Sequence, residues 1–134
     1  MASMGYLLDD ITYDPRICLE RSVEIEKAGF RDLWDCDHLL PWYHTDGHSV
    51  SLTVQLTEYL NRTKNIPVGS LVYCPIGLRY QPVDIALIMA SMELFHPGRI
   101  MCGIGAGEAM NEKAATGQWP PPKERVERME EAIQ

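Results

Sequence analysis

Four side chains that could do chemistry follow apolar runs with the character of buried strands. Asp37 and His38 come directly after the run that ends at Cys36, Cys74 follows a second run, and Glu108 follows a third. If these runs are parallel strands, their carboxyl ends lie at one edge of a sheet, and residues far apart in sequence can meet there. A histidine and a glutamate that face each other across such an edge could divide acid and base work.

Each of these residues also has an ordinary structural interpretation. His38 could be a hydrogen-bonded structural histidine, and Glu108 could be a carboxylate that the dipole favours at a helix start. His44 and His48 lie in the same loop as His38, but this spacing is nonspecific and H-E-x-x-H is absent, so we predict no metal. Trp42 could pack in the core or form an aromatic wall for a planar cofactor.

The segment Gly103-x-Gly105-x-Gly107 invites a dinucleotide-binding interpretation, but its spacing is wrong. The pattern G-x-G-x-x-G requires glycine at position 108 when it starts at Gly103, and Gly or Ala at position 110 when it starts at Gly105. The chain has Glu108 and Met110 there. We predict instead that these glycines let the backbone approach a flat ligand closely.

The elements that must position these residues alternate along the chain. Short apolar runs predict strands at 4–8, 31–36, 66–72 and 100–104. Periodic segments and capping signals predict helices at about 15–28, 49–61 and 83–95, a short piece after 108, and a last helix from near 123. This order predicts an α/β fold with a parallel sheet, as either an open doubly wound sheet or part of a (β/α) barrel.

Composition limits the classes of protein that this chain can belong to. Its 134 residues suit one domain, and a hydrophobic fraction of 46% suffices for a core, while the net charge of −7 argues against a nucleic-acid partner. No apolar run approaches the roughly 20 residues of a membrane span, and the start of the chain lacks a signal-peptide pattern. Four cysteines without metal or redox spacing predict reduced, mostly buried thiols. We therefore expect a cytoplasmic protein with no membrane partner.

The helix expected at 83–95 is unusual because it is apolar on nearly every side. Only Asp84 and Glu93 carry charge within it. A helix that is hydrophobic all round is normally buried, so we expect this one to be covered on more than one side.

Several blocks, in this order, resemble the coenzyme F420-dependent branch of the luciferase-like oxidoreductases. Within that branch the chain is most similar to the glucose-6-phosphate dehydrogenase and secondary alcohol dehydrogenase subgroup, over nearly its whole length. The blocks are Asp37-His38-x-x-Pro41-Trp42, Cys74-Pro75, Arg79-Tyr80-Gln81-Pro82, Pro97-Gly98-Arg99, the run from Gly105 to Glu112, and Thr116-Gly117-x-Trp119-Pro120.

The resemblance implies a TIM-type barrel with a 5-deazaflavin at its C-terminal mouth, and hydride transfer between this cofactor and the carbon of a small-molecule alcohol or sugar. It implies acid/base work at the substrate hydroxyl for His38, proton exchange with the deazaflavin ring for Glu108, and a place against the reacting centre for Trp42. A cis peptide is implied between Leu71 and Val72. The cofactor contacts that it implies are Asp37, Leu71, Val72, Cys74, Ala106, Gly107 and Asn111.

The length of the chain qualifies the resemblance. Four βα units are half of an eightfold barrel, so we expect residues 1–134 to be the N-terminal half of one, a single partial domain from a protein that is a homodimer at full length. Such a half leaves two strand edges unpaired and the helix at 83–95 incompletely covered. Ile11 stands where relatives carry a glutamate that faces the substrate, and one extra residue, Gly77 or Leu78, precedes Arg79.

Two alternatives stay open at this point. The first is an FMN-dependent luciferase-like monooxygenase, which keeps the fold and exchanges the cofactor. The second is a non-catalytic half-barrel that needs a partner.

Overall fold

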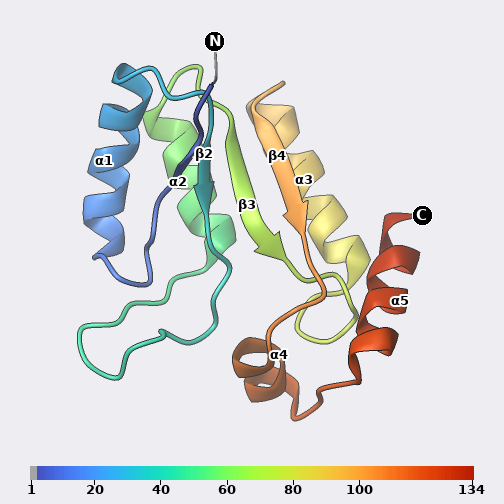
Figure 1. Cartoon of the computed structure of the whole chain (residues 1–134). Coiled ribbons are helices and arrows are strands. Elements are labelled where there is room, and N and C mark those ends of the chain that lie inside the picture. Colours follow the sequence, from blue (N-terminus) through green and yellow to red (C-terminus); the bar gives the residue numbers. More distant parts are fainter. Residues whose placement is uncertain (1–2) are drawn as a thin grey trace.

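The computed structural model describes residues 3–134, and within them four strands alternate with helices (Figure 1). The strands are β1 (Tyr6–Leu7), β2 (Leu33–Asp35), β3 (Val68–Tyr73) and β4 (Ile100–Ile104). The helices are α1 (Pro15–Lys27), α2 (Leu52–Arg62), α3 (Pro82–Phe95), α4 (Ala109–Thr116) and α5 (Pro122–Ile133). The predicted order of elements is confirmed, although β1 and β2 are shorter than the apolar runs that predicted them.

The strand order decides between the two predicted architectures. All neighbouring strands are parallel, and their order in the sheet is β1-β2-β3-β4. A doubly wound sheet reverses its strand order at a switch point, whereas successive strands of a (β/α) barrel are always neighbours. The sheet therefore has the connectivity of a barrel, with β1 and β4 at its open edges.

The core lies between the sheet and the helices on one face of it. In Figure 1, α2 and α3 lie behind the sheet. Leu33 of β2 pairs in register with Val68 of β3, which pairs with Ile100 of β4. Leu33 and Val68 are buried in the core against Leu56 and Leu60 of α2. This packing fixes the direction of the strands and, with it, the edge at which their carboxyl ends meet.

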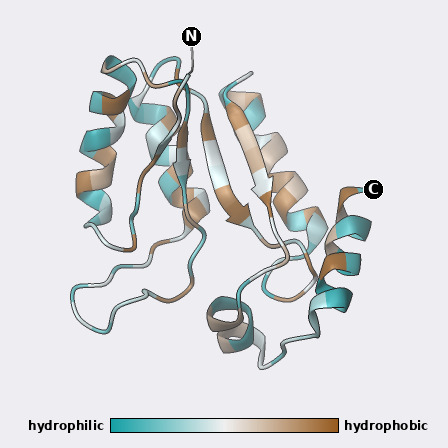
Figure 2. Cartoon of the chain, viewed as in Figure 1, coloured by the Kyte–Doolittle hydropathy of each residue, from teal (hydrophilic) through white to brown (hydrophobic). Residues whose placement is uncertain are grey.

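Helix α3 departs from the prediction that it is covered on more than one side. Hydrophobic colour runs along much of it (Figure 2), yet only Ile85 and Met92 are buried. The large apolar side chains that remain 67–76% exposed are Val83, Leu87, Leu94 and Phe95. One face of α3 packs towards β4, and no described residue covers the opposite face. The prediction of two-sided burial is therefore wrong for this chain, whereas the predicted incomplete cover is confirmed.

The amino-terminal ends of β3 and β4, away from the carboxyl edge, are tied together by charged side chains. The guanidinium of Arg99 donates hydrogen bonds to carbonyl oxygens of Leu60, Thr63 and Ile66. The carboxylate of Glu26 accepts the backbone N–H groups of residues 64–66. Desolvation acts against this, but the backbone donors outweigh it and lower the pKa of Glu26. The connection from α2 to β3 is thus held rigidly.

The four cysteines are free. Cys18 and Cys74 are buried, Cys36 is half-buried and Cys102 is exposed. Cys102 lies on β4, which is an edge strand and has no further neighbour among the described residues. The expectation of mostly buried thiols is therefore confirmed for Cys18 and Cys74, is met in part by Cys36 and is wrong for Cys102.

Two buried carboxyl groups join the segment after β1 to the end of β2. Asp10 is 2% exposed and Asp35 is 0% exposed, and each of the two carboxyl groups shifts the pKa of the other. Asp35 accepts the hydroxyl of Tyr59 at 2.5 Å and the N–H of Cys36 at 2.8 Å. Desolvation, and then the charge of Asp35, raises the pKa of Asp10 to about 8. Desolvation also raises the pKa of Asp35, to about 6, so at neutral pH Asp10 is the protonated member of the pair.

This pair predicts a pH dependence of stability that Asp10→Asn should reduce, most clearly above about pH 6, where the contribution of Asp35 has ended. The pKa of Asp10 is higher in the folded chain than in the unfolded one, so its proton stabilises the fold fully below about pH 4, and this stabilisation is lost as the pH rises through about 8. The wild-type free energy of unfolding should therefore fall between those limits, by at most about 1.4 kcal/mol per pH unit for one proton. Asp10→Asn should show a flatter profile and exceed wild type above pH 8.

Urea unfolding of both proteins across this range is the measurement. Glu20→Gln, which removes an exposed carboxylate on α1, is the matched control and should keep the wild-type slope. Equal slopes for wild type and Asp10→Asn would show that the pair does not hold a proton.

Candidate functional site

A pocket of about 200 Å³ lies at the carboxyl ends of β2, β3 and β4. Two of the three predicted catalytic residues, His38 and Glu108, line it. All seven predicted cofactor contacts line it as well: Asp37, Leu71, Val72, Cys74, Ala106, Gly107 and Asn111. Parallel strands that end at one edge bring these residues together, as the sequence pattern predicted.

The backbone around the pocket matches one expectation and adds a reason for the glycines. The peptide bond between Leu71 and Val72 is cis, as predicted. Gly105 and Gly107 line the pocket, so their predicted approach to a flat ligand stays a prediction. A Cβ atom on Gly103 would lie 2.2 Å from the carbonyl oxygen of Ser70, and one on Gly105 would lie 2.6 Å from the side chain of Val72. These two glycines allow β4 and the turn after it to pack closely against β3.

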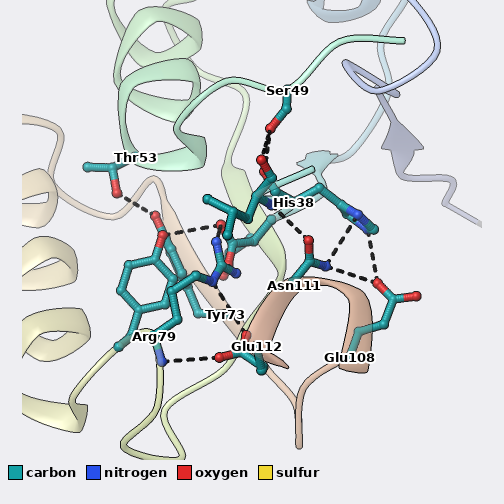
Figure 3. Close-up of polar contacts among 12 residues, drawn as sticks. His38, Ser49, Thr53, Tyr73, Arg79, Glu108, Asn111 and Glu112 are labelled. Atoms are coloured by element: carbon teal, nitrogen blue, oxygen red, sulfur yellow. Dashed lines mark hydrogen bonds and ion pairs between the residues drawn. The ribbon is translucent and has the colours of Figure 1, made fainter. Parts of the chain in front are cut away.

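His38, Glu108 and Asn111 form a connected group at the mouth of the pocket (Figure 3). His38 Nε2 lies 3.6 Å from Glu108 Oε2. The amide nitrogen of Asn111 donates to Glu108 Oε2 at 3.0 Å and lies 3.3 Å from His38 Nδ1. The His38 side chain is 10% exposed and that of Glu108 is 52% exposed. A buried imidazole therefore faces a carboxylate that is open to a ligand.

The surroundings of His38 act on its charge in both directions. Desolvation is the largest influence and lowers the pKa of His38. The carboxylates of Glu108 and Asp37 oppose this, whereas the guanidinium of Arg79 adds to it. The net effect favours the neutral imidazole at neutral pH.

Trp42 lies outside the pocket lining but against His38. The two rings meet edge to face, with centroids 5.0 Å apart and planes at 86°. Trp42 is 50% exposed, so one side of the indole is free. Its predicted place against the reacting centre stays a prediction, and its contact with the imidazole is what the structure adds.

Arg79 is the main site residue to which the sequence analysis assigned no role. Its guanidinium bridges the carboxylates of Asp37 and Glu112, and its backbone N–H donates to Glu112 as well. The side chains of Arg79, Asp37 and Glu112 are only 12%, 2% and 1% exposed. Tyr80 completes the group, because its hydroxyl donates to Asp37 at 3.3 Å and its ring lies under the Arg79 guanidinium. The Arg79-Tyr80 block marked this position, but nothing local in the sequence identified its two partners.

This bridge decides the electrostatics beneath the pocket. Desolvation raises the pKa of Asp37, and the charge of Arg79 opposes that shift. Without a cation, two buried carboxylates would lie close together in a medium of low dielectric constant, which is strongly unfavourable. Arg79 therefore places one positive charge between the carboxylates of Asp37 and Glu112, at a site where all three side chains are nearly buried.

The described part of the chain lacks two other kinds of feature, a metal site and a membrane-spanning helix. Across residues 3–134, no group of three or more His, Cys, Asp or Glu side chains could hold a metal ion. In the same span, every helix is too short or too polar to cross a membrane.

Comparison with known proteins places this site in a family. Residues 8–134 match the family model described as luciferase-like monooxygenase. The chain belongs to the luciferase-like monooxygenase family. Its predicted fold class is thereby confirmed, since its four βα units are part of a TIM-type barrel.

The luciferase-like chain is similar to several dehydrogenases. It is 38% identical over 134 residues to an F420-dependent glucose-6-phosphate dehydrogenase of Amycolatopsis mediterranei, covering 99% of this chain and 40% of that protein. It is 44% identical over 108 residues to an F420-dependent hydroxymycolic acid dehydrogenase of Mycobacterium tuberculosis, covering 81% and 30%. The luciferase-like chain thus spans about 40% of the length of the first of these relatives.

A solved structure allows the backbones to be compared directly. An F420-dependent secondary alcohol dehydrogenase, in complex with an F420-acetone adduct, superposes on the luciferase-like chain with a TM-score of 0.94 and 36% identity. The match covers 98% of this chain and 39% of that one. The arrangement of the four βα units is therefore shared almost completely.

The Arg79 bridge predicts a large loss of stability in Arg79→Met. Removing one partner of a buried ion pair leaves an uncompensated charge and costs about 3–5 kcal/mol. The double variant Arg79→Met with Glu112→Gln should be less destabilised than the sum of the single variants, because it no longer confronts Asp37 with a second carboxylate. Urea unfolding at neutral pH measures all of these free energies.

Arg62→Met is the matched control for this experiment. Arg62 pairs with Glu58 on the surface of α2, where both side chains are nearly half exposed. Its loss should cost less than about 1 kcal/mol. If Arg79→Met cost no more than this control, the bridge would not stabilise the fold.

Proposed function

We propose that this chain carries the deazaflavin site of a coenzyme F420-dependent oxidoreductase that acts on CH–OH groups. The reaction is hydride transfer between the carbon of an alcohol or sugar and the cofactor. The observation that carries the proposal is the pocket at the strand ends, where a His38–Glu108 pair adjoins seven residues of the types expected for a planar heterocycle. Relatives that cover nearly the whole chain are F420-dependent dehydrogenases, which supports the same cofactor here. Residues 1–134 would be a single partial domain of that enzyme.

The residues of the pocket suit such a cofactor. Leu71, Val72 and Ala106 offer apolar surface for a ring face, and the polar residues Asp37 and Asn111 line the same pocket. Desolvation raises the pKa of the Cys74 thiol to about 12, so this side chain contributes packing and not a thiolate. These residues would hold the deazaflavin, which supplies the atom that accepts or donates the hydride.

The chain's own residues would orient the substrate and handle its proton. We propose that His38 acts at the substrate oxygen, because its ring reaches the pocket and is shielded from water by Trp42 and the loop around it. Glu108 is the exposed carboxylate within 3.6 Å of that ring, and we propose that it takes part in proton exchange. A positioned acid/base group typically contributes about 10²–10⁴-fold to the rate.

The substrate class is best described as a small alcohol or sugar. Arg79 is the one cationic side chain among the described residues that line the pocket, apart from the titratable His38. It is engaged by Asp37 and Glu112, so a sugar phosphate would need cations from elsewhere. Ile11, at the position where a substrate-facing glutamate was expected, is 1% exposed and does not line the pocket.

We further propose that the full-length protein is a homodimer that assembles through α3, with no nucleic-acid or membrane partner and a cytoplasmic location. A groove of about 750 Å³ runs between α2 and α3. The apolar side chains Leu87 and Phe95 line it and are 67% and 76% exposed. Exposed apolar surface of this kind is typical of a protein interface. In a twofold homodimer the same groove on each copy would bury the groove of the other.

The cofactor proposal predicts the outcome of a fluorescence titration of the 134-residue chain. The chain should quench the fluorescence of oxidised coenzyme F420 in a saturable way, and it should not bind FMN. Ala106→Leu should weaken binding at least about tenfold, because it fills the pocket. Ala114→Leu, on the exposed side of α4, is the matched control and should bind as wild type does.

Each other outcome of the titration has a definite meaning. Binding of FMN alone would replace the deazaflavin with a flavin and favour the monooxygenase alternative. Binding of neither would mean that the chain does not form a cofactor site by itself, which favours the half-barrel alternative.

The homodimer proposal predicts the sedimentation behaviour of α3 variants. The wild-type chain should self-associate through the apolar groove, and Leu87→Lys with Phe95→Lys should sediment as a monomer because the charges cannot be buried. Val54→Lys, at an exposed apolar position of α2 outside the groove, should leave association unchanged. A monomeric wild type would contradict this proposal.

A further inference from the structure

The amide of Asn111 is buried, and its orientation is determined by backbone donors. Asn111 is 3% exposed. Its Oδ1 accepts the backbone N–H of Leu39 at 2.9 Å and is 3.4 Å from the nitrogen of Leu40. A backbone N–H can only donate, so the oxygen of the amide must face these groups. The amide nitrogen must then point the other way, towards His38 and Glu108 (Figure 3).

The amide nitrogen of Asn111 carries two hydrogens and has two neighbours. One is the carboxylate oxygen of Glu108, at 3.0 Å, which accepts. The other is Nδ1 of His38, at 3.3 Å. An amide nitrogen cannot accept a hydrogen bond, so a hydrogen on Nδ1 would point at another N–H. The contact is favourable only when Nδ1 has its lone pair, and the neutral imidazole then carries its hydrogen on Nε2.

We propose that Asn111 is a positioning residue that holds His38 as the Nε2–H tautomer, so that His38 presents an N–H to the pocket and Glu108 is the proton acceptor of the pair. This proposal rests on the proposed function and deepens it. It refines the acid/base role predicted for His38, which becomes a hydrogen-bond donor to the substrate oxygen. A neutral imidazole can serve as an electrophile in this way.

The reaction balances with this division of labour. In the oxidative direction a bound deazaflavin in its oxidised form would accept the hydride that leaves when the substrate C–H bond breaks with its electron pair. The O–H bond breaks, its proton passes to the carboxylate of Glu108, and the electron pair left on oxygen forms the C=O bond. The Nε2–H of His38 hydrogen-bonds to that oxygen throughout and stabilises the charge that develops on it. In the reductive direction each step is reversed.

The other groups around His38 leave this arrangement possible. Ser49 donates to the carbonyl oxygens of His38 and Leu39 at 2.8 and 2.9 Å, which holds the loop in place. Trp42 meets the ring edge to face. The backbone of Leu40 raises the pKa of His38, whereas desolvation, the larger influence, lowers it. Burial favours the neutral ring but does not decide which nitrogen carries the hydrogen, so the tautomer has to be measured.

The test is a long-range ¹H–¹⁵N correlation spectrum of the imidazoles in the 134-residue chain, with His38→Gln used to assign the His38 signals. Above the pKa of the ring, wild type should show a pyrrole-type Nε2 and a pyridine-type Nδ1. Asn111→Asp keeps the shape of the side chain and an acceptor for Leu39, but it turns an acceptor towards Nδ1. His38 should then change to the Nδ1–H tautomer or titrate at higher pH.

Asn61→Asp, on the exposed side of α2, is the matched control and should leave the His38 signals unchanged. Unfolding midpoints of both variants show whether they fold. A pyridine-type Nε2 in wild type would overturn the proposal, and so would His38 signals that do not respond to Asn111→Asp in a folded chain.

This readout needs no cofactor, so the two proposals fail separately. The wrong tautomer together with F420 binding would remove the role of Asn111 and keep the proposed function. The expected tautomer without F420 binding would do the reverse.

Discussion

The arrangement of the site depends on one guanidinium between two buried carboxylates. Asp37 follows β2, Glu112 lies in α4, and Arg79 lies in the turn between β3 and α3. The bridge joins these three segments beneath the pocket. Buried carboxylates without a cation would repel one another or take up protons, so the bridge sets both the shape and the charge of this region.

Helix α4 transmits this arrangement to the groups that face a ligand. Glu108, Asn111 and Glu112 lie at positions i, i+3 and i+4 at its start, and such positions share one face of a helix. Glu112 is held by Arg79 below, while Asn111 holds the loop after β2 through the N–H of Leu39. A short helix of eight residues therefore positions a carboxylate, an amide and an ion-pair partner with one rigid backbone.

The ends of the strands are held by buried polar contacts, whereas the outer face of α3 is exposed. The edge that carries the pocket is supported by the Arg79 bridge and the Asp10–Asp35 pair, and the opposite end is held by Arg99 and Glu26. The outer face of α3 has no such support, and its apolar side chains lie in solvent. Exposed apolar side chains of this kind favour association, because burying them against a second surface releases water. The residues of the site are thus held by several polar contacts, while the apolar outer face of α3 stays exposed.

Local signals in the sequence determined the elements and the residues at their ends. Asp14 and Pro15 predicted the start of α1, and the Asp14 side chain does accept the N–H of Arg16. The run 100–104 predicted β4 at its observed bounds. The pattern of polar residues after apolar runs predicted that Asp37, His38, Cys74 and Glu108 would meet. These inferences succeeded because hydrogen bonding within a helix, capping and strand direction depend on residues that are close in sequence.

Tertiary structure alone decided the remaining features, because they depend on contacts between distant segments. The order of the strands separated a barrel from a doubly wound sheet. The partners of Arg79, the close approach of Gly103 to Ser70, and the orientation of the Asn111 amide all require the packed sheet before they exist. The exposure of α3 depends on which elements pack against it, and its apolar sequence alone does not determine them. Sequence by itself therefore determined which groups reach the site, and packing decided how their charges and protons are held.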